Sequence, residues 1–67
     1  MNFYINKARI FLRIEEYGLS LSTLSKLSNL SMNYLNKMLA GKTKKILPFL
    51  NISKILNLPL SEMILFE

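Results

Sequence analysis

The sequence has neither cysteine nor histidine among its 67 residues. No disulfide and no thiolate metal site can form, and the commonest metal ligand and general base are missing. Few carboxylates are present, and two of the four, Glu15 and Glu16, are adjacent, so on a helix they would diverge by about 100°. We therefore expect no enzymatic activity, no bound metal and no cofactor, and nothing in the sequence indicates a small-molecule ligand.

Long apolar runs are also absent. The longest unbroken run covers residues 63–66, whereas a membrane-spanning helix needs roughly 20 apolar residues. Near the N-terminus, Arg13, Glu15 and Glu16 interrupt what would have to be the apolar core of a signal peptide. We expect no membrane partner and a cytoplasmic location.

Acidic residues are outnumbered by basic ones. Nine Lys and Arg against four Asp and Glu give a net charge of +5, with a pI near 9.8. A basic small domain indicates either a nucleic acid or an anionic membrane surface as its partner. Because no segment suits a membrane, the charge favours nucleic acid.

Glycine and proline are scarce, with two of each. They cut the chain into short pieces, and the apolar residues of each piece recur at helical spacing. Valine is absent and Leu, Ile, Lys and Met dominate, which suits helices better than strands. The sequence predicts a single all-α domain over residues 1–67, built from five short helices.

The first helix is expected to end at Gly18, and its apolar face should carry Ile10, Phe11, Ile14 and Tyr17. A fourth helix, from about Ile46 to Leu56, is apolar around most of its circumference and should be central and buried. Pro48 fits only its first turn, which sets the helix start near Leu47. A short last helix is expected over residues 60–65, after Pro59.

The spacing of apolar and capping residues over 20–41 predicts two helices joined by a tight turn. Ser20 is a good N-cap for the first, with Leu21, Leu24 and Leu27 as its apolar face. Asn29 tolerates a left-handed backbone and can make the turn.

Ser31 caps the second helix of this pair, Gly41 ends it, and its apolar positions are Leu35, Met38 and Leu39. A helix-turn-helix at about residues 20–40 is therefore expected.

Polar side chains dominate the other face of that second helix. Met32, Asn33, Asn36 and Lys37 face outward, with Tyr34 between the two faces. In DNA-binding helix-turn-helix proteins the second helix lies in the major groove, where Asn can pair with adenine and Lys with guanine. The loop that follows supplies three lysines at positions 42, 44 and 45, which would meet phosphate oxygens.

Residues 18–64 resemble the lambda-repressor and Cro family of helix-turn-helix domains, also called Xre-like. The resemblance rests on an ordered set of short matches: Gly18-Leu19-Ser20, residues 24–27, Leu30-Ser31, Leu35, Met38, Gly41-Lys42 and residues 56–64. It implies a five-helix fold that binds operator DNA as a symmetric dimer. Three departures from the family pattern are present. Asn29 stands where Gly is usual, and Ile14 and Leu39 stand where an Arg and a Glu often pair. Leu21 stands where a phosphate-binding Gln is usual, so this leucine must either face the DNA backbone or turn inward.

The resemblance also implies residue roles. Carried over by position, the residues that contact bases are Met32, Asn33, Tyr34 and Lys37, with Asn36 nearby. Those that contact phosphates are Ser20, Lys42, Thr43, Lys44 and, from its place in the loop, Lys45. The family's dimer contacts suggest Met63, Leu65 and Phe66. The alternative is that Phe66 folds back on the first helix, against Phe3 or Tyr4.

Two functions remain open from the sequence. The first is a transcriptional regulator, a repressor or autorepressor of a phage, plasmid or bacterial operon, that binds a palindromic operator in double-stranded DNA as a homodimer. The second is a protein-interaction module on a helix-turn-helix fold that no longer binds DNA, such as an antitoxin-like or anti-CRISPR-like inhibitor.

Overall fold

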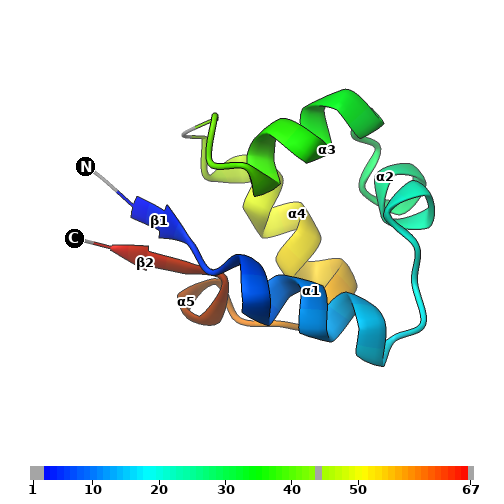
Figure 1. Cartoon of the computed structure of the whole chain (residues 1–67), viewed down its shortest axis with the longest axis horizontal. Helices are drawn as coiled ribbons and strands as arrows, with labels where there is room; N and C mark the ends of the chain where they lie inside the picture. The colour runs from blue at the N-terminus through cyan, green and yellow to red at the C-terminus, as the bar shows by residue number, and fades with distance from the viewer. Residues whose placement is uncertain (1–2, 44, 67) are drawn as a thin grey trace.

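A computed structural model describes residues 3–43 and 45–66. Within these ranges the chain forms five helices and two short strands: β1 (Phe3–Ile5), α1 (Lys7–Glu16), α2 (Leu21–Ser28), α3 (Met32–Leu39), α4 (Leu47–Leu56), α5 (Leu60–Met63) and β2 (Ile64–Phe66). Figure 1 shows α2 and the start of α3 at one end of the molecule and the strands at the other. The prediction of a small, mainly helical domain is confirmed, but the fold is not strictly all-α.

The strands form an antiparallel two-stranded sheet. Three cross-strand pairs define its register: Phe3 with Phe66, Tyr4 with Leu65, and Ile5 with Ile64. A helix over residues 60–65 was therefore a wrong prediction, since α5 ends at Met63 and the backbone is extended at Ile64, with φ −133° and ψ 149°. Pairing with β1 replaces further helix, and the bond from Asn6 N–H to the Met63 carbonyl oxygen, at 2.7 Å, begins this pairing.

The core takes side chains from every helix and from both strands. Its buried members are Phe3, Ile10, Ile14, Leu24, Leu35, Met38, Leu39, Phe49, Ile52, Leu56, Leu58, Met63 and Ile64. Phe49 of α4 is fully buried and meets the ring of Phe3 edge to face, with 6.0 Å between centroids and 85° between planes. This contact joins the sheet to the helical core.

The apolar faces of three helices are narrower than predicted. Phe11 of α1 and Tyr17, directly after α1, are exposed, Leu27 of α2 is 58% exposed, and Leu47 of α4 is 75% exposed. A domain of this size buries only about 60% of its unfolded surface, so some apolar residues at helical spacing must remain outside.

The starts of α2 and α3 and the ends of α1 and α3 lie where the sequence predicts them. Ser20 and Ser31 each accept a hydrogen bond from the backbone N–H three residues further on, at 3.0 and 3.1 Å. Gly18 and Gly41 follow α1 and α3 with φ of 64° and 76°, a backbone that favours glycine.

Helices α2 and α4 end in the same way. Residues 25–30 read SKLSNL and residues 53–58 read SKILNL. In both, the asparagine has a positive φ, and the N–H of the final leucine donates to the carbonyl of the first serine at 3.0 and 3.1 Å. The same serine's hydroxyl donates to the carbonyl of that leucine. One cap fixes the path from α2 to α3, and the other fixes the path from α4 to α5.

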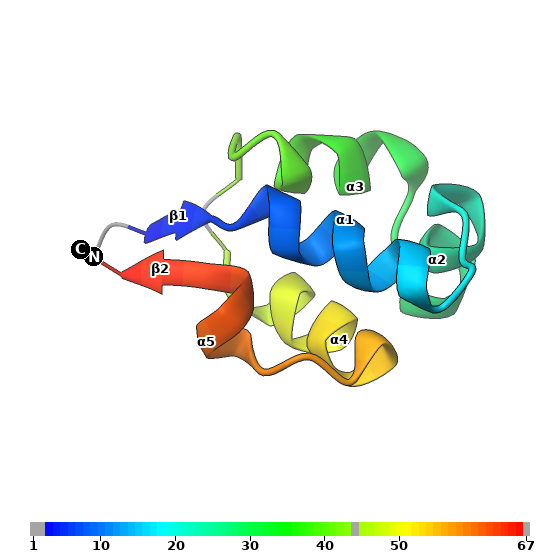
Figure 2. The same ribbon diagram turned by 60° about the horizontal axis from the view of Figure 1, so that its bottom comes forward.

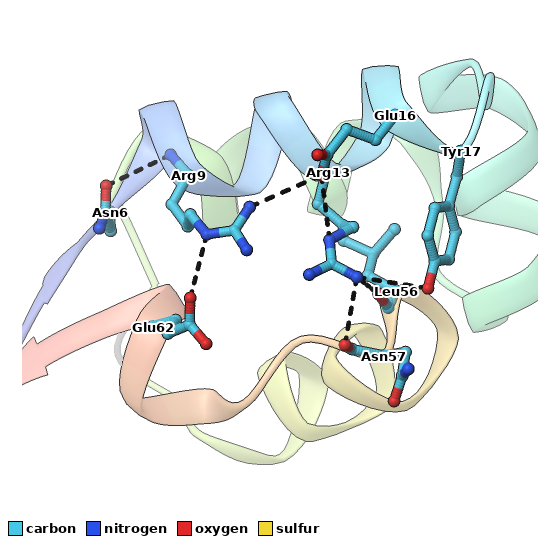
Figure 3. Close-up of polar contacts among 8 residues, drawn as sticks. All are labelled: Asn6, Arg9, Arg13, Glu16, Tyr17, Leu56, Asn57 and Glu62. Atoms are coloured by element: carbon cyan, nitrogen blue, oxygen red, sulfur yellow. Dashed lines mark hydrogen bonds and ion pairs between the residues drawn. The ribbon is translucent and has the colours of Figure 1, made fainter.

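Ion pairs join α1 to α5 (Figure 3). Arg9 Nε lies 3.1 Å from Glu62 Oε1 of α5. Glu16 Oε1 lies 3.2 Å from Arg13 Nε and 3.8 Å from Arg9 Nη1. Both arginines are thus already paired with carboxylates on this side of the molecule.

Arg13 also ties α1 to the end of α4. Its Nη1 donates to the carbonyl oxygens of Leu56 and Asn57, at 3.3 and 3.4 Å. A cation at a helix C-terminus is favourable because the partial charge there is negative. The two contacts fix α1 against the end of α4, and in the view of Figure 2 α3 lies above α1 while α4 lies below it.

Candidate nucleic-acid interface

Helix α3 is attached to the core through one side only. Leu35, Met38 and Leu39 are at most 4% exposed and face inward. The other side presents four exposed side chains: Met32, Asn33, Asn36 and Lys37. These four positions recur as i, i+1, i+4 and i+5, which places them on one face of a helix. Four of the five residues predicted to contact bases therefore share one accessible face.

Tyr34 is the exception among the predicted base contacts. It is half-buried and packs against the hydrophobic core. At i+4 from it lies the fully buried Met38, so the ring lies at the border of the inward face. Tyr34 thus lies between the two faces, as the helical spacing predicts, and its contact with a base stays a prediction.

Leu21 turns inward at the start of α2. Its side chain is half-buried and packs against the core. The core therefore covers part of this apolar side chain. The exposed positions at this helix start are hydroxyl residues, Ser20, Ser22 and Thr23. Ser20, a predicted phosphate contact, uses its hydroxyl to cap the helix while remaining exposed.

The loop after α3 carries two exposed lysines in its described part. Lys42 follows α3 directly, since its N–H donates to the Lys37 carbonyl at 2.9 Å, and Lys45 is exposed further on. The predicted contact at Lys44 lies outside the described residues.

Thr43, also predicted to contact phosphate, is half-buried, and its hydroxyl oxygen is shielded from solvent. A direct phosphate contact by Thr43 was therefore a wrong prediction.

Positive charge is concentrated in the middle of the chain. Residues 17–61 contain six lysines and no acidic residue, whereas the rest of the chain has three basic and four acidic residues. The acids Glu16 and Glu62 pair with the arginines of α1. The whole excess of positive charge thus belongs to the segment from α2 to α4.

Lys7 is a further cation near this surface. It is exposed at the start of α1, and with Tyr4 and Ile5 it lines an open cavity of about 360 Å³. The opposite wall is the end of α3, at Leu39, Ala40 and Gly41. No local sequence pattern could have predicted that Lys7 lies near the end of α3, because 34 positions separate it from Gly41 and only the fold brings them together.

The predicted dimer residues divide into two groups. Met63 is fully buried in the core, so assigning it to an interface was wrong. Leu65 and Phe66 are 54% and 52% exposed on β2. The ring of Phe66 lies 6.1 Å from that of Phe3 of β1, as the alternative expected, while half of the residue remains accessible.

A comparison of the chain with profiles of known protein families and with the sequences of curated proteins gave no match. No helix within residues 3–43 and 45–66 is both long and apolar enough to cross a membrane. The same residues bring no three potential metal ligands of the His, Cys, Asp or Glu type together.

Proposed function

We propose that the protein is a transcriptional regulator that binds a specific sequence in double-stranded DNA. The observation that carries this proposal is the exposed face of α3, whose residues Met32, Asn33, Asn36 and Lys37 are free while the opposite face is anchored in the core. In this proposal residues 20–40 act as a helix-turn-helix of the lambda-repressor and Cro type. Helix α3 enters the major groove, and α2 lies across the DNA backbone.

Phosphate contacts come from the cations beside α3. Lys42 and Lys45 follow the helix, and Lys7 lies across the cavity from its end. Ser20 and the neighbouring N–H groups at the start of α2 form a second place for a phosphate, since helix N-termini attract anions. A protein bound in this way at an operator would exclude RNA polymerase, so we propose repression, including repression of its own operon.

A mobility-shift experiment tests the proposal directly. The full chain is mixed with a labelled duplex from the region upstream of its own gene and, separately, with an unrelated duplex of equal length. We expect a discrete shifted band with the upstream duplex that survives an excess of the unrelated one. No shift of either duplex at micromolar protein would contradict the proposal.

The two matching helix caps provide a paired prediction. Ser25→Ala and Ser53→Ala each remove a hydroxyl that donates to a leucine carbonyl, so each should lower the free energy of unfolding by about 1 kcal/mol. Only Ser25 lies at the junction of α2 and α3. We therefore expect Ser25→Ala to weaken DNA binding several-fold under conditions where both variants are folded, with Ser53→Ala unchanged. Equal losses of DNA affinity would contradict the assignment of α2 and α3.

A homodimer is the proposed binding form, joined through β2. The strand places Leu65 opposite Tyr4 on the outer face of the sheet, and both are more than half exposed. An apolar strand at a sheet edge can pair with a second strand. Two copies related by a two-fold axis would then match a palindromic operator.

Sedimentation velocity checks the dimer. We expect the wild type to sediment as a dimer at tens of micromolar and Leu65→Asp as a monomer. The matched control is Leu47→Asp, which adds the same charge at a 75% exposed leucine on α4 and should leave the dimer intact. A monomeric wild type, or the same loss in both variants, would remove β2 as the interface.

One observation favours the second candidate function, a protein-interaction module. Leu12, Leu27 and Leu47 are each more than half exposed, on three different helices. Exposed leucines suit contact with another protein where they form one contiguous patch. A folded chain that shifts no DNA in the mobility experiment would favour this function.

A further inference from the structure

We propose that the exposed face of α3 reads an A·T-rich half-site, in which Asn33 and Asn36 meet neighbouring adenines and Met32 meets a thymine methyl group. This inference rests on the proposed DNA-binding function and adds the base composition of the target.

The chemistry of the face suits two of the four bases. Its four side chains are two carboxamides, one thioether and one amine, with no guanidinium and no carboxylate. In the major groove, Asn or Gln pairs with adenine, apolar groups contact the thymine methyl, Arg or Lys pairs with guanine, and Glu or Asp accepts from cytosine. The two amides and the thioether therefore suit A and T, and the amine suits G. The face has no carboxylate to accept a hydrogen bond from cytosine.

The two amides are placed for neighbouring base pairs. At about 100° and 1.5 Å per residue, Asn33 and Asn36 lie roughly 60° apart around α3 and about 4.5 Å apart along it. That rise is close to the spacing of about 3.4 Å between successive bases on one strand. Around the helix Ala40 lies between them, and this small residue leaves room for the base edges.

Neither amide has a structural task. Across residues 3–43 and 45–66, no side-chain hydrogen bond involves Asn33 or Asn36. Other asparagines do shape the fold, since Asn6 caps α1 and both Asn29 and Asn57 adopt the positive φ that ends a helix. The two amides of α3 are thus free to bind a ligand, and both are exposed.

Met32 and Lys37 lie at opposite borders of this face, about 140° apart. Met32, 39% exposed, lies on the side of the buried Leu35 and Leu39, which suits an apolar contact with a methyl group. Lys37 lies on the side of Tyr34 and reaches outward from the middle of α3. We assign it to the edge of the half-site, to a guanine or a phosphate.

Selection of bound duplexes from a random-sequence library, with the full chain, is the first test. The selected half-sites should contain consecutive A·T pairs with two adjacent adenines on one strand. The selected duplex is then remade with uracil in place of each thymine in turn, which removes only the methyl group, and with 7-deazaadenine, which removes the N7 acceptor.

The modified duplexes are measured against matched variants. One uracil should weaken wild-type binding about fourfold and should have no effect on Met32→Ala. Each 7-deazaadenine should weaken the wild type about tenfold. It should have no effect on the alanine variant of the asparagine that meets that adenine, Asn33 or Asn36, and should still weaken the other variant. All three substitutions are at exposed positions, so thermal melting should be unchanged.

The outcomes separate the two proposals. Enrichment of G·C-rich half-sites, or modified bases that act equally on the wild type and the alanine variants, overturns the A·T inference and leaves DNA binding in place. A library from which nothing is retained overturns both.

Discussion

Raising the salt concentration from 50 to 200 mM is expected to weaken DNA binding about a thousand-fold. The physical reason is counterion release, because each lysine that neutralises a phosphate frees condensed cations from the DNA. If a dimer neutralises about six phosphates, log K should fall against log salt with a slope near −5. Fluorescence anisotropy with the duplex chosen by selection measures this slope.

Two lysine variants show where the salt dependence originates. Lys45→Gln removes a cation from the loop after α3 and should flatten the slope by about 2, one phosphate for each copy in a dimer. Lys54→Gln removes a cation from the last turn of α4, at the far end of that helix from the loop (Figure 1), and should leave the slope unchanged. A flat salt dependence in the wild type would mean that lysines do not hold the DNA.

Replacing Phe49 by alanine is expected to unfold the domain. The ring is fully buried, and its edge-to-face contact with Phe3 connects α4 to the sheet. Truncation of a buried Phe to Ala lowers the free energy of unfolding by about 3–5 kcal/mol. A single core in a chain this short supplies only about that much in total, so the variant should have no stable native state at 25 °C.

Leu47→Ala is the control for that experiment, two residues away on the same helix. Leu47 is 75% exposed, and such surface substitutions usually change stability by less than about 0.5 kcal/mol. Urea unfolding followed by circular dichroism compares the two variants with the wild type. A loss below about 1 kcal/mol for Phe49→Ala would show that the core does not depend on this ring.

The sequence was sufficient to predict the structural features that depend on a few neighbouring residues. Ser20 and Ser31 start helices, and Gly18 and Gly41 follow their ends, because capping depends on one side chain and the N–H groups next to it. The outward face of α3 was also predictable, since helical period alone separates Asn33 and Asn36 from the buried Leu35. All these features depend on spacing.

Features that depend on distant residues were not predictable. The pairing of β1 with β2 joins the two ends of the chain, so Met63 was placed outside the core and Ile64 in a helix. Thr43 was expected to reach a phosphate, whereas its hydroxyl oxygen is shielded from solvent. The two similar hexapeptides at residues 25–30 and 53–58, which differ at two positions, are visible in the sequence, but the structure shows that each ends a helix.

The β1–β2 pairing also bears on the order in which the chain folds. Helix hydrogen bonds join residues four positions apart, and the α2–α3 junction involves residues 25–30, whereas the sheet pairs Phe3 with Phe66. Closing so long a loop costs more chain entropy than forming a helical turn, so contacts between distant residues form slowly. The sheet should therefore close last. During synthesis, α2 and α3 would form before β2, the edge strand through which the proposed dimer is joined.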